Sequence, residues 1–409
     1  MNKKRRSPGR RLAGVVMLFY FLAFLVLALR DRDTLGFILC VSVPLLIFLG
    51  TTLLPRLFPT DRLLMSLTNF LCALGVLILY DTKPDYAIQQ VLAYGVGLGG
   101  MLFCIYLVRM SRGWGRITTI IMPMALAFLA FPLLFGKEIN GAQNWIVLGS
   151  FSFQPSEIVK PALVICLSWR MSSRQHLVWV LFGTLCLLLL ALQRDFGTAL
   201  IYFLSTILLF WCSTGHLPLT LLGLAAGGGA AWWGYQHFAH VRRRVAIWLN
   251  PWRDSENAGY QLIQGLMAIA SGGLFGVGLG LGAPTSIPVY ASDFIFAVIC
   301  EQFGLVFGIC VLLIFVALIL RSAMIAVSAR RRFHSLLAAG SAAMIGIQAF
   351  LIIGGVLKLI PLTGVTLPFI SYGGTSLVSC LCLVGLIQGV ESLNEEELEQ
   401  DAHLAMLSR

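Results

Sequence analysis

Charged residues are scarce in this chain of 409 residues. Lys, Arg, Asp and Glu together make up 11% of the sequence, whereas 58% is hydrophobic and the mean hydropathy is +0.87. A soluble domain of this length cannot bury so much apolar surface, so lipid must be the solvent for most of the chain. The composition therefore excludes a soluble globular protein and predicts an all-α, polytopic membrane protein.

The sequence also lacks the spacings typical of metal and nucleotide sites. Its ten cysteines lie in or beside apolar runs, and none belongs to a CxxC motif, which favours packing residues over a disulfide or metal framework. The glycines of "SGGLFGVGLGLG" (271–282) do not fit GxGxxG and follow no predicted strand. They indicate a tight turn with close backbone approach rather than a dinucleotide loop.

The net charge of +11 is distributed in short basic stretches between apolar runs, at 3–11, 109–116 and 321–332. This is the pattern of cytoplasmic loops in membrane proteins, so it predicts membrane orientation and not a nucleic-acid partner. The basic N-terminus and first apolar run lack a small-residue cleavage site, which favours an uncleaved first helix over a signal peptide.

About twelve runs are apolar enough to span a bilayer. They are 12–29, 35–54, 62–80, 88–109, 117–136, 155–172, 176–192, 196–212, 216–238, 294–320, 336–358 and 368–390. The basic loops put both termini in the cytoplasm. Three segments then face outward: 137–154, the long stretch 239–293 and the short 359–368. The basic residues of "VRRRVAIWLNPWR" oppose this orientation, but long loops escape the charge rule.

Four acids lie at or inside the ends of predicted spans, namely Glu157, Asp195, Asp293 and Glu301. An ionisable group at membrane depth is a functional hypothesis by default, with a structural ion pair as the equal alternative. Lys160 follows Glu157 by one helical turn, so the structural interpretation is the stronger one for that pair. Polar residues of four separate stretches are predicted to converge on the outer face.

Five long motifs occur in order along the chain: "GAQNWIVLGSFSFQPSEIVK", "QRDFGTA", "NPWRDSENAGYQLIQGLMAIASGGLFGVGLG", "IPVYASDFIFAVICEQFG" and "PLTGVTLPFISYGGTS". With them the chain resembles the SEDS family, the membrane peptidoglycan polymerases of the FtsW, RodA and SpoVE type. The resemblance implies a core of ten helices over about 60–392. Residues 1–59 then form an N-terminal extension with two further transmembrane helices, and 393–409 form an acidic cytoplasmic tail.

The resemblance also implies an activity. The family polymerises lipid II, a disaccharide-peptide on undecaprenyl pyrophosphate, into glycan strands at the outer face of the cytoplasmic (inner) membrane. The 4-hydroxyl of the incoming sugar attacks the anomeric carbon of the growing chain, and the configuration inverts. A class B penicillin-binding protein, a transpeptidase, is the usual partner. Cell division, elongation and sporulation all stay open as roles.

By the same resemblance Asp293 matches the essential Asp of the family, and a carboxylate there is suited to accept the hydroxyl proton. The leaving pyrophosphate needs positive charge, from Lys160, Arg243, Arg244 or a divalent cation such as Mg²⁺, and no metal ligands are assigned. The motifs match further expected substrate-binding positions. These are Trp145, Gln154, Ser156, Glu157, Lys160, Asp195, Arg243, Arg244, Tyr260, Gln261, Gln264, Glu301, Ser371 and Tyr372.

The chain departs from the family pattern at several positions. Asn144 replaces an Arg, Arg194 a Pro, Gly265 a Ser and Gln302 the second Glu of a pair, while Ala291 stands where a polar residue is common. Arg194 is a candidate to supply the missing charge. Two other functions stay open: a flippase or transporter of lipid-linked precursors, and a non-catalytic scaffold for a penicillin-binding protein.

Overall fold

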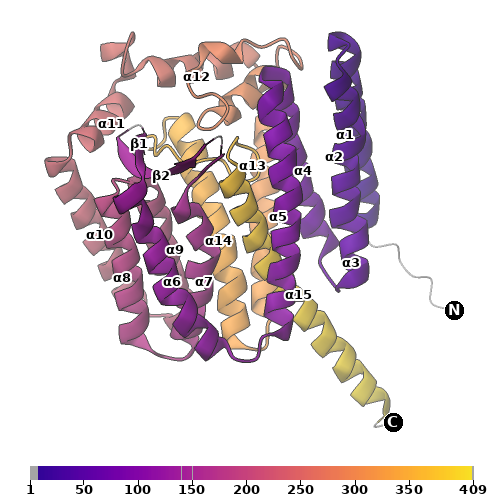
Figure 1. Cartoon of the computed structure of the whole chain (residues 1–409), viewed down its shortest axis with the longest axis vertical. Coiled ribbons are helices and arrows are strands. Elements are labelled where there is room, and N and C mark those ends of the chain that lie inside the picture. Colours follow the sequence, from indigo (N-terminus) through magenta and orange to yellow (C-terminus); the bar gives the residue numbers. More distant parts are fainter. Residues whose placement is uncertain (1–7, 140, 150, 408–409) are drawn as a thin grey trace.

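The computed structural model describes residues 8–139, 141–149 and 151–407. Long helices run side by side through it, and shorter elements lie across one end of the bundle (Figure 1). Nine of the described helices are long and apolar enough to cross a membrane. The apolar runs of the sequence therefore fold as the predicted all-α, multi-pass membrane protein.

The helices follow the predicted spans closely. They are α1 (Pro8–Asp31), α2 (Thr34–Phe48), α3 (Leu54–Leu57), α4 (Arg62–Thr82), α5 (Pro84–Met110), α6 (Trp114–Phe135), α7 (Pro155–Ser172), α8 (His176–Leu192), α9 (Phe196–Thr214), α10 (Leu217–His237), α11 (Ala239–Leu249), α12 (Tyr260–Gly272), α13 (Ile295–Ser328), α14 (Arg332–Val356) and α15 (Gly374–Leu407). A π-helical turn, Leu49–Leu53, joins α2 to α3. All twelve predicted spans correspond to helices, although α7, α8 and α10 are shorter or less apolar than the nine.

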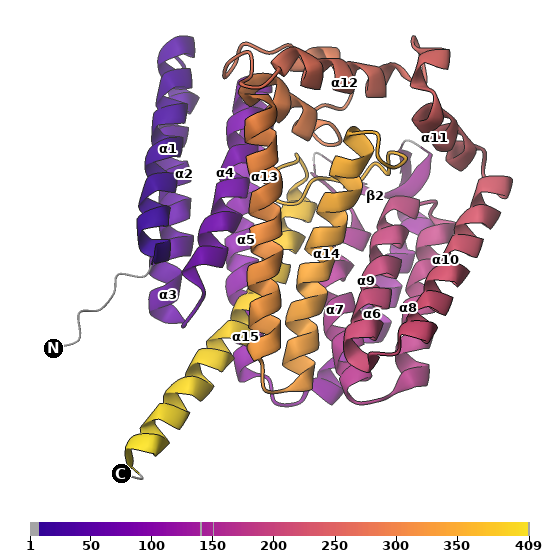
Figure 2. The ribbon, with the colours of Figure 1, turned by 180° about the vertical axis from the view of Figure 1, so that it is seen from behind.

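The N-terminal hairpin of α1 and α2 lies at one edge of the bundle, against α4 (Figures 1 and 2). Gly36 of α2 lies so close to α1 that a Cβ there would be 2.7 Å from the Cβ of Ala28. The hydroxyl of Tyr20 on α1 donates a 2.7 Å hydrogen bond to the carbonyl of Phe70 on α4. In lipid, such close packing and interhelical hydrogen bonds replace the hydrophobic effect as the force that joins helices.

The described residues between α6 and α7 and the segments 239–293 and 359–373 all lie at the same end of the bundle, which we call the loop end (Figures 1 and 2). Three short strands between α6 and α7 form a small antiparallel sheet that the apolar runs did not predict: β1 (Lys137–Ile139), β2 (Ala142–Leu148) and β3 (Phe151–Phe153), in the order β1-β2-β3. Residues 239–293 hold α11, α12 and short 3₁₀ turns at Pro251–Asp254 and Pro284–Ser286. Both described chain ends lie at the opposite end.

The last helix, α15, packs along α5 in the middle of the bundle. A Cβ on Gly385 would lie 2.6 Å from the carbonyl oxygen of Met101, so only glycine permits this approach. The predicted tail is not a separate element, because α15 continues without a break to Leu407 and leaves the bundle as a helix. Acids of this extension pair with Arg109 and Arg330. Residues 408–409 of the tail lie outside the described residues.

Candidate functional site

Asp293 lies at the loop end, in the segment that leads into α13. Its backbone N–H donates to the carbonyl of Val289 at 3.2 Å, which closes a turn. The hydroxyl of Ser292 donates to Asp293 Oδ1 at 2.9 Å. The carboxylate is therefore fixed at one oxygen by its neighbour in the chain, while the side chain as a whole stays partly exposed.

Arg244 on α11 lies near Asp293 across Gly364, close enough for their charges to interact but without an ion pair between them. Its guanidinium donates to the carbonyl of Thr363 at 2.9 Å. Gly364 follows with a φ of +71°, and a Cβ there would lie 3.5 Å from Arg244 Nη2 and 3.8 Å from Asp293 Oδ2. The absence of a side chain at Gly364 thus leaves open the space between Arg244 and Asp293. The left-handed backbone conformation of Gly364 is one that other residues rarely adopt.

The surroundings of this pair shift both ionisation equilibria. Burial raises the pKa of Asp293, against the opposing effects of the Ser292 hydrogen bond and the Arg244 charge. Burial also lowers the pKa of Arg244, although the charges of Asp293 and Asp195 oppose that shift. A carboxylate of raised basicity beside a cation is suited to accept a proton from a hydroxyl group.

The segment 367–373 holds the backbone in front of Asp293. Ser371 Oγ donates to the carbonyl of Ser292 at 2.5 Å and accepts from the backbone N–H of Leu367 at 2.8 Å. The N–H of Tyr372 donates to the carbonyl of Ala291 at 2.9 Å. The structure therefore brings two sequence-predicted residues, Ser371 and Tyr372, against the segment that carries Asp293, where they position its main chain.

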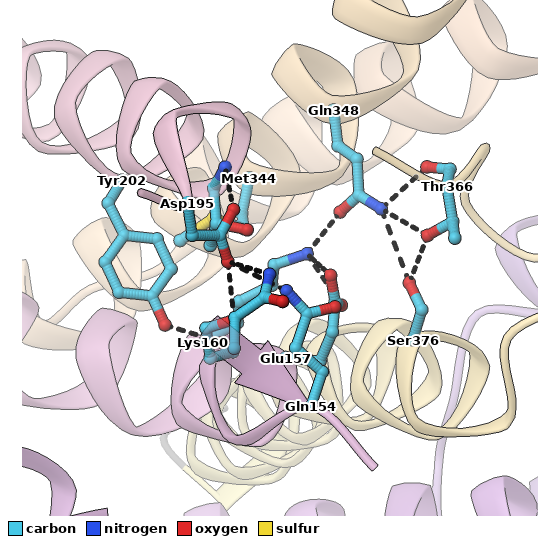
Figure 3. Close-up of polar contacts among 12 residues, drawn as sticks. Gln154, Glu157, Lys160, Asp195, Tyr202, Met344, Gln348, Thr366 and Ser376 are labelled. Carbon is cyan, nitrogen blue, oxygen red and sulfur yellow. Dashed lines mark hydrogen bonds and ion pairs between the residues drawn. The ribbon is translucent and has the colours of Figure 1, made fainter. Parts of the chain in front are cut away.

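A second cluster surrounds Asp195, which begins α9 (Figure 3). Its Oδ2 accepts hydrogen bonds from Asn144 at 3.0 Å, Gln154 at 2.8 Å and Ser156 at 3.2 Å. Its Oδ1 accepts from the N–H of Thr198, as a helix cap does. The structure thus brings the predicted residues Gln154 and Ser156 to Asp195. Both oxygens of the Asp195 carboxylate accept hydrogen bonds, which join α7, α9 and β2. Asn144, where the family pattern has Arg, is one of its buried donors.

Glu157 and Lys160 form the ion pair that their spacing indicates, with the Lys160 ammonium 2.7 Å from each carboxylate oxygen. The third donor of Lys160 goes to Gln348 Oε1 at 2.7 Å, and the amide of Gln348 donates on to Thr366 (Figure 3). Lys160 is fully buried, so its proposed contact with the pyrophosphate is wrong: no donor is left for a ligand. Sequence reasoning missed Gln348, Thr366 and Ser376, whose polarity within apolar runs was the available signal.

The remaining predicted residues are dispersed. Gln261 on α12 donates to the carbonyl of Pro288 at 3.2 Å, whereas Tyr260 is exposed and Gln264 half-buried. Arg243 lines a separate pocket with Asp254, and Asp293 is not part of that lining.

Glu301 and Trp145 also lie away from the pair of Asp293 and Arg244. Glu301 accepts from the N–H of Ala283 at 3.1 Å, within the glycine-rich turn. Trp145 lies on β2 opposite Lys137. Within the described residues no three His, Cys, Asp or Glu side chains cluster as metal ligands would.

Arg194 has a φ of +59° and is exposed. The pKa of His240 is lowered by burial and by the nearby charges of Arg244 and Arg194. Arg194 and Arg244 therefore both contribute positive potential at His240.

Comparisons with known proteins all indicate the same family. The model of the FtsW/RodA/SpoVE family, described as cell cycle protein, matches residues 63–396. A peptidoglycan glycosyltransferase RodA of Mycobacterium tuberculosis is 32% identical over 365 residues, covering 80% of this chain and 77% of the relative. Stage V sporulation protein E of Bacillus subtilis is 33% identical over 357 residues, covering 81% of this chain and 96% of the relative.

Two solved structures share the fold. A chain from a peptidoglycan synthase complex that coordinates polymerization and crosslinking aligns with a TM-score of 0.69 at 29% identity, over 82% of this chain and 98% of that one. RodA of Thermus thermophilus aligns with a TM-score of 0.60 at 28% identity, over the same shares. The motif order, the helical bundle and these matches agree, and the chain belongs to the FtsW/RodA/SpoVE family of membrane proteins.

Proposed function

We propose that this chain is a peptidoglycan glycosyltransferase that polymerises lipid II, with Asp293 as its general base. The observation that carries the proposal is the placement of Asp293 and Arg244 on either side of Gly364 at the loop end, close enough for their charges to interact. Burial raises the pKa of Asp293, so its carboxylate is more basic than an ordinary one. The relatives named as peptidoglycan glycosyltransferases support the reaction class.

In the proposed reaction the 4-hydroxyl oxygen of the incoming sugar bonds to the anomeric carbon of the growing chain. The bond from that carbon to the pyrophosphate oxygen breaks, so undecaprenyl pyrophosphate leaves with the bonding electrons and the configuration inverts. The hydroxyl proton passes to Asp293 as the new bond forms. Arg244 is suited to the charge that develops on the leaving pyrophosphate, because guanidinium groups bind such anions through charge-assisted hydrogen bonds.

We place the loop end at the outer face of the cytoplasmic membrane and both termini in the cytoplasm. The basic residues near 110 and 330 belong to the opposite end of the bundle, which supports this orientation. A class B penicillin-binding protein is the proposed partner. The similar solved chain comes from a complex that combines polymerization with crosslinking, which supports a partner of that kind.

The test uses purified protein in detergent with its transpeptidase partner and labelled lipid II. Wild-type protein is expected to make glycan strands, and Asp293→Asn to lose at least about a hundredfold in rate, as general-base catalysis implies. Absence of strands from wild type with any partner would favour the scaffold. Translocation of lipid II in sealed vesicles without strand synthesis would favour the flippase.

A further inference from the structure

A pocket of about 290 Å³ opens beside the segment that carries Asp293. Its walls come from three parts of the chain that are distant in sequence: the start of α5, the backbone of 289–291 and the segment before α15. The side chains that matter are Lys83, Tyr86, Tyr290, Ser292 and Tyr372. Only Tyr372 was expected from the sequence motifs, so most of this pocket belongs to no site described above.

Stacked aromatic rings and one cation give the pocket its chemistry. The rings of Tyr86 and Tyr372 stack with centroids 4.0 Å apart and an interplanar angle of 13°. Lys83 Nζ lies 4.2 Å from the centroid of the Tyr86 ring. Within the part of the chain that the structure describes, this exposed ammonium interacts with Tyr86 and has no carboxylate within ion-pair distance. It is therefore available to an anion from outside the protein.

The pocket and Arg244 are related to Asp293 through different carboxylate oxygens. Ser292 lines the pocket and donates to Asp293 Oδ1, whereas Arg244 lies near Oδ2 across Gly364. The loop end thus carries two cations near the segment of Asp293: Arg244 across Gly364, and Lys83 in the wall of the pocket. The proposed reaction joins two lipid-linked sugars, and each of them carries a pyrophosphate.

We propose that the pocket is the acceptor subsite, in which a sugar ring of the incoming lipid II packs on the tyrosines and Lys83 binds its pyrophosphate. This inference rests on the proposed polymerase function. A sugar presents an apolar ring face to aromatic side chains and hydroxyls to polar ones, and tyrosine offers both surfaces. An ammonium in turn binds phosphate oxygens through charge-assisted hydrogen bonds.

The chemistry of the two substrates indicates which cation binds which pyrophosphate. In the growing chain the pyrophosphate is attached to the reacting carbon. The cation that binds this pyrophosphate must therefore lie near Asp293, as Arg244 does. In the incoming lipid II a disaccharide separates the reacting hydroxyl from the pyrophosphate. That pyrophosphate therefore meets a cation farther from Asp293, and the exposed Lys83 at the tyrosine pocket meets this requirement.

The test measures acceptor and donor kinetics separately. A lipid-linked tetrasaccharide serves as donor at saturating concentration while labelled lipid II is varied, and the two are then exchanged. Lys83→Gln is expected to raise KM for lipid II at least about tenfold, because it loses one charge-assisted contact. Tyr86→Leu is expected to raise the same KM, because it removes an aromatic ring on which the sugar packs. Their kcat and their KM for the donor are expected to stay within about twofold of wild type.

Two further variants serve as controls. Lys83→Arg keeps the charge and is expected to restore most of the affinity, which a structural role of the side chain would not require. Lys137→Gln removes an exposed cation on β1 outside the pocket and is expected to leave both KM values unchanged.

An unchanged KM for lipid II in Lys83→Gln, or an increase confined to the donor, would overturn the assignment. Because Lys83 is exposed, its variant decides the question even if Tyr86→Leu fails to fold. A wild-type protein that makes no strands would instead refute the polymerase function on which the subsite rests.

Discussion

Gln302 on α13 donates a 2.7 Å hydrogen bond to Asp81 Oδ2 at the end of α4. Asp81 Oδ1 forms an ion pair with Arg30 of α1 at 3.0 Å, and Arg30 also donates to the carbonyl of Gly280 at 3.1 Å. The N-terminal hairpin, which precedes the family match, is thereby joined to the glycine-rich turn and to α13. An amide at 302, where the family pattern has Glu, is what this contact requires.

Gln302→Glu is expected to destabilise the protein, because a second carboxylate would then face Asp81 where a donor now lies. The loss of a buried hydrogen bond to a charged group corresponds to about 1–3 kcal/mol. Thermal unfolding in detergent measures the effect. Adding Asp81→Asn to that variant removes the repulsion between like charges and is expected to recover part of the lost stability. If Gln302→Glu alone were as stable as wild type, the interpretation would be contradicted.

Arg244→Gln is expected to move the acid limb of the pH–rate profile to higher pH. The Arg244 charge holds the pKa of Asp293 down against burial, so removing the charge lets that pKa rise further. Activity needs the ionised carboxylate, and it is therefore lost at a higher pH as the solution is acidified. Initial rates of strand synthesis across a pH series measure the limb. A lower rate with an unmoved limb would exclude Asp293 as the titrating base.

Gly265→Ser restores the residue of the family pattern and is nevertheless expected to destabilise this chain. A Cβ at 265 would lie 2.3 Å from Cδ1 of Phe294, a fully buried ring next to Asp293. Overpacking of this kind costs about 1–3 kcal/mol. Thermal unfolding gives the comparison, with Gly229→Ser on α10 as control, because a Cβ there meets nothing within 4 Å. Equal unfolding temperatures for the two variants would refute the steric argument.

Glu157→Gln is expected to lower stability strongly, because the fully buried Lys160 would lose its only carboxylate partner among the described residues. Breaking a buried ion pair from one side costs about 3–5 kcal/mol. The double variant Glu157→Leu and Lys160→Met removes both charges and is expected to be more stable than Glu157→Gln. Urea or thermal unfolding of both variants measures the difference. A double variant less stable than Glu157→Gln would show that Lys160 is not held as a charged group.

The helices could be predicted from the sequence because each apolar run must satisfy its own backbone in lipid, so length and hydropathy suffice. The small sheet could not: strands as short as β1 and β3 depend on pairing partners and not on their own composition. The acids at span ends were equally visible in the sequence. Their roles were not, since Asp195 receives four hydrogen bonds and Glu157 an ammonium, whereas Asp293 stays partly open.

The sequence by itself thus determined a multi-pass helical membrane protein, its family and Asp293 as the candidate base. Only the tertiary structure showed which of the candidate cations lies near that acid. It buries Lys160 in an ion pair, places Arg243 in a separate pocket, and brings Arg244 near Asp293 across Gly364. It also joins Lys83, Tyr86 and Tyr372 in one pocket. Such contacts join segments up to about 290 residues apart, and no local pattern encodes them because each depends on how α5, α11, α13 and α15 pack.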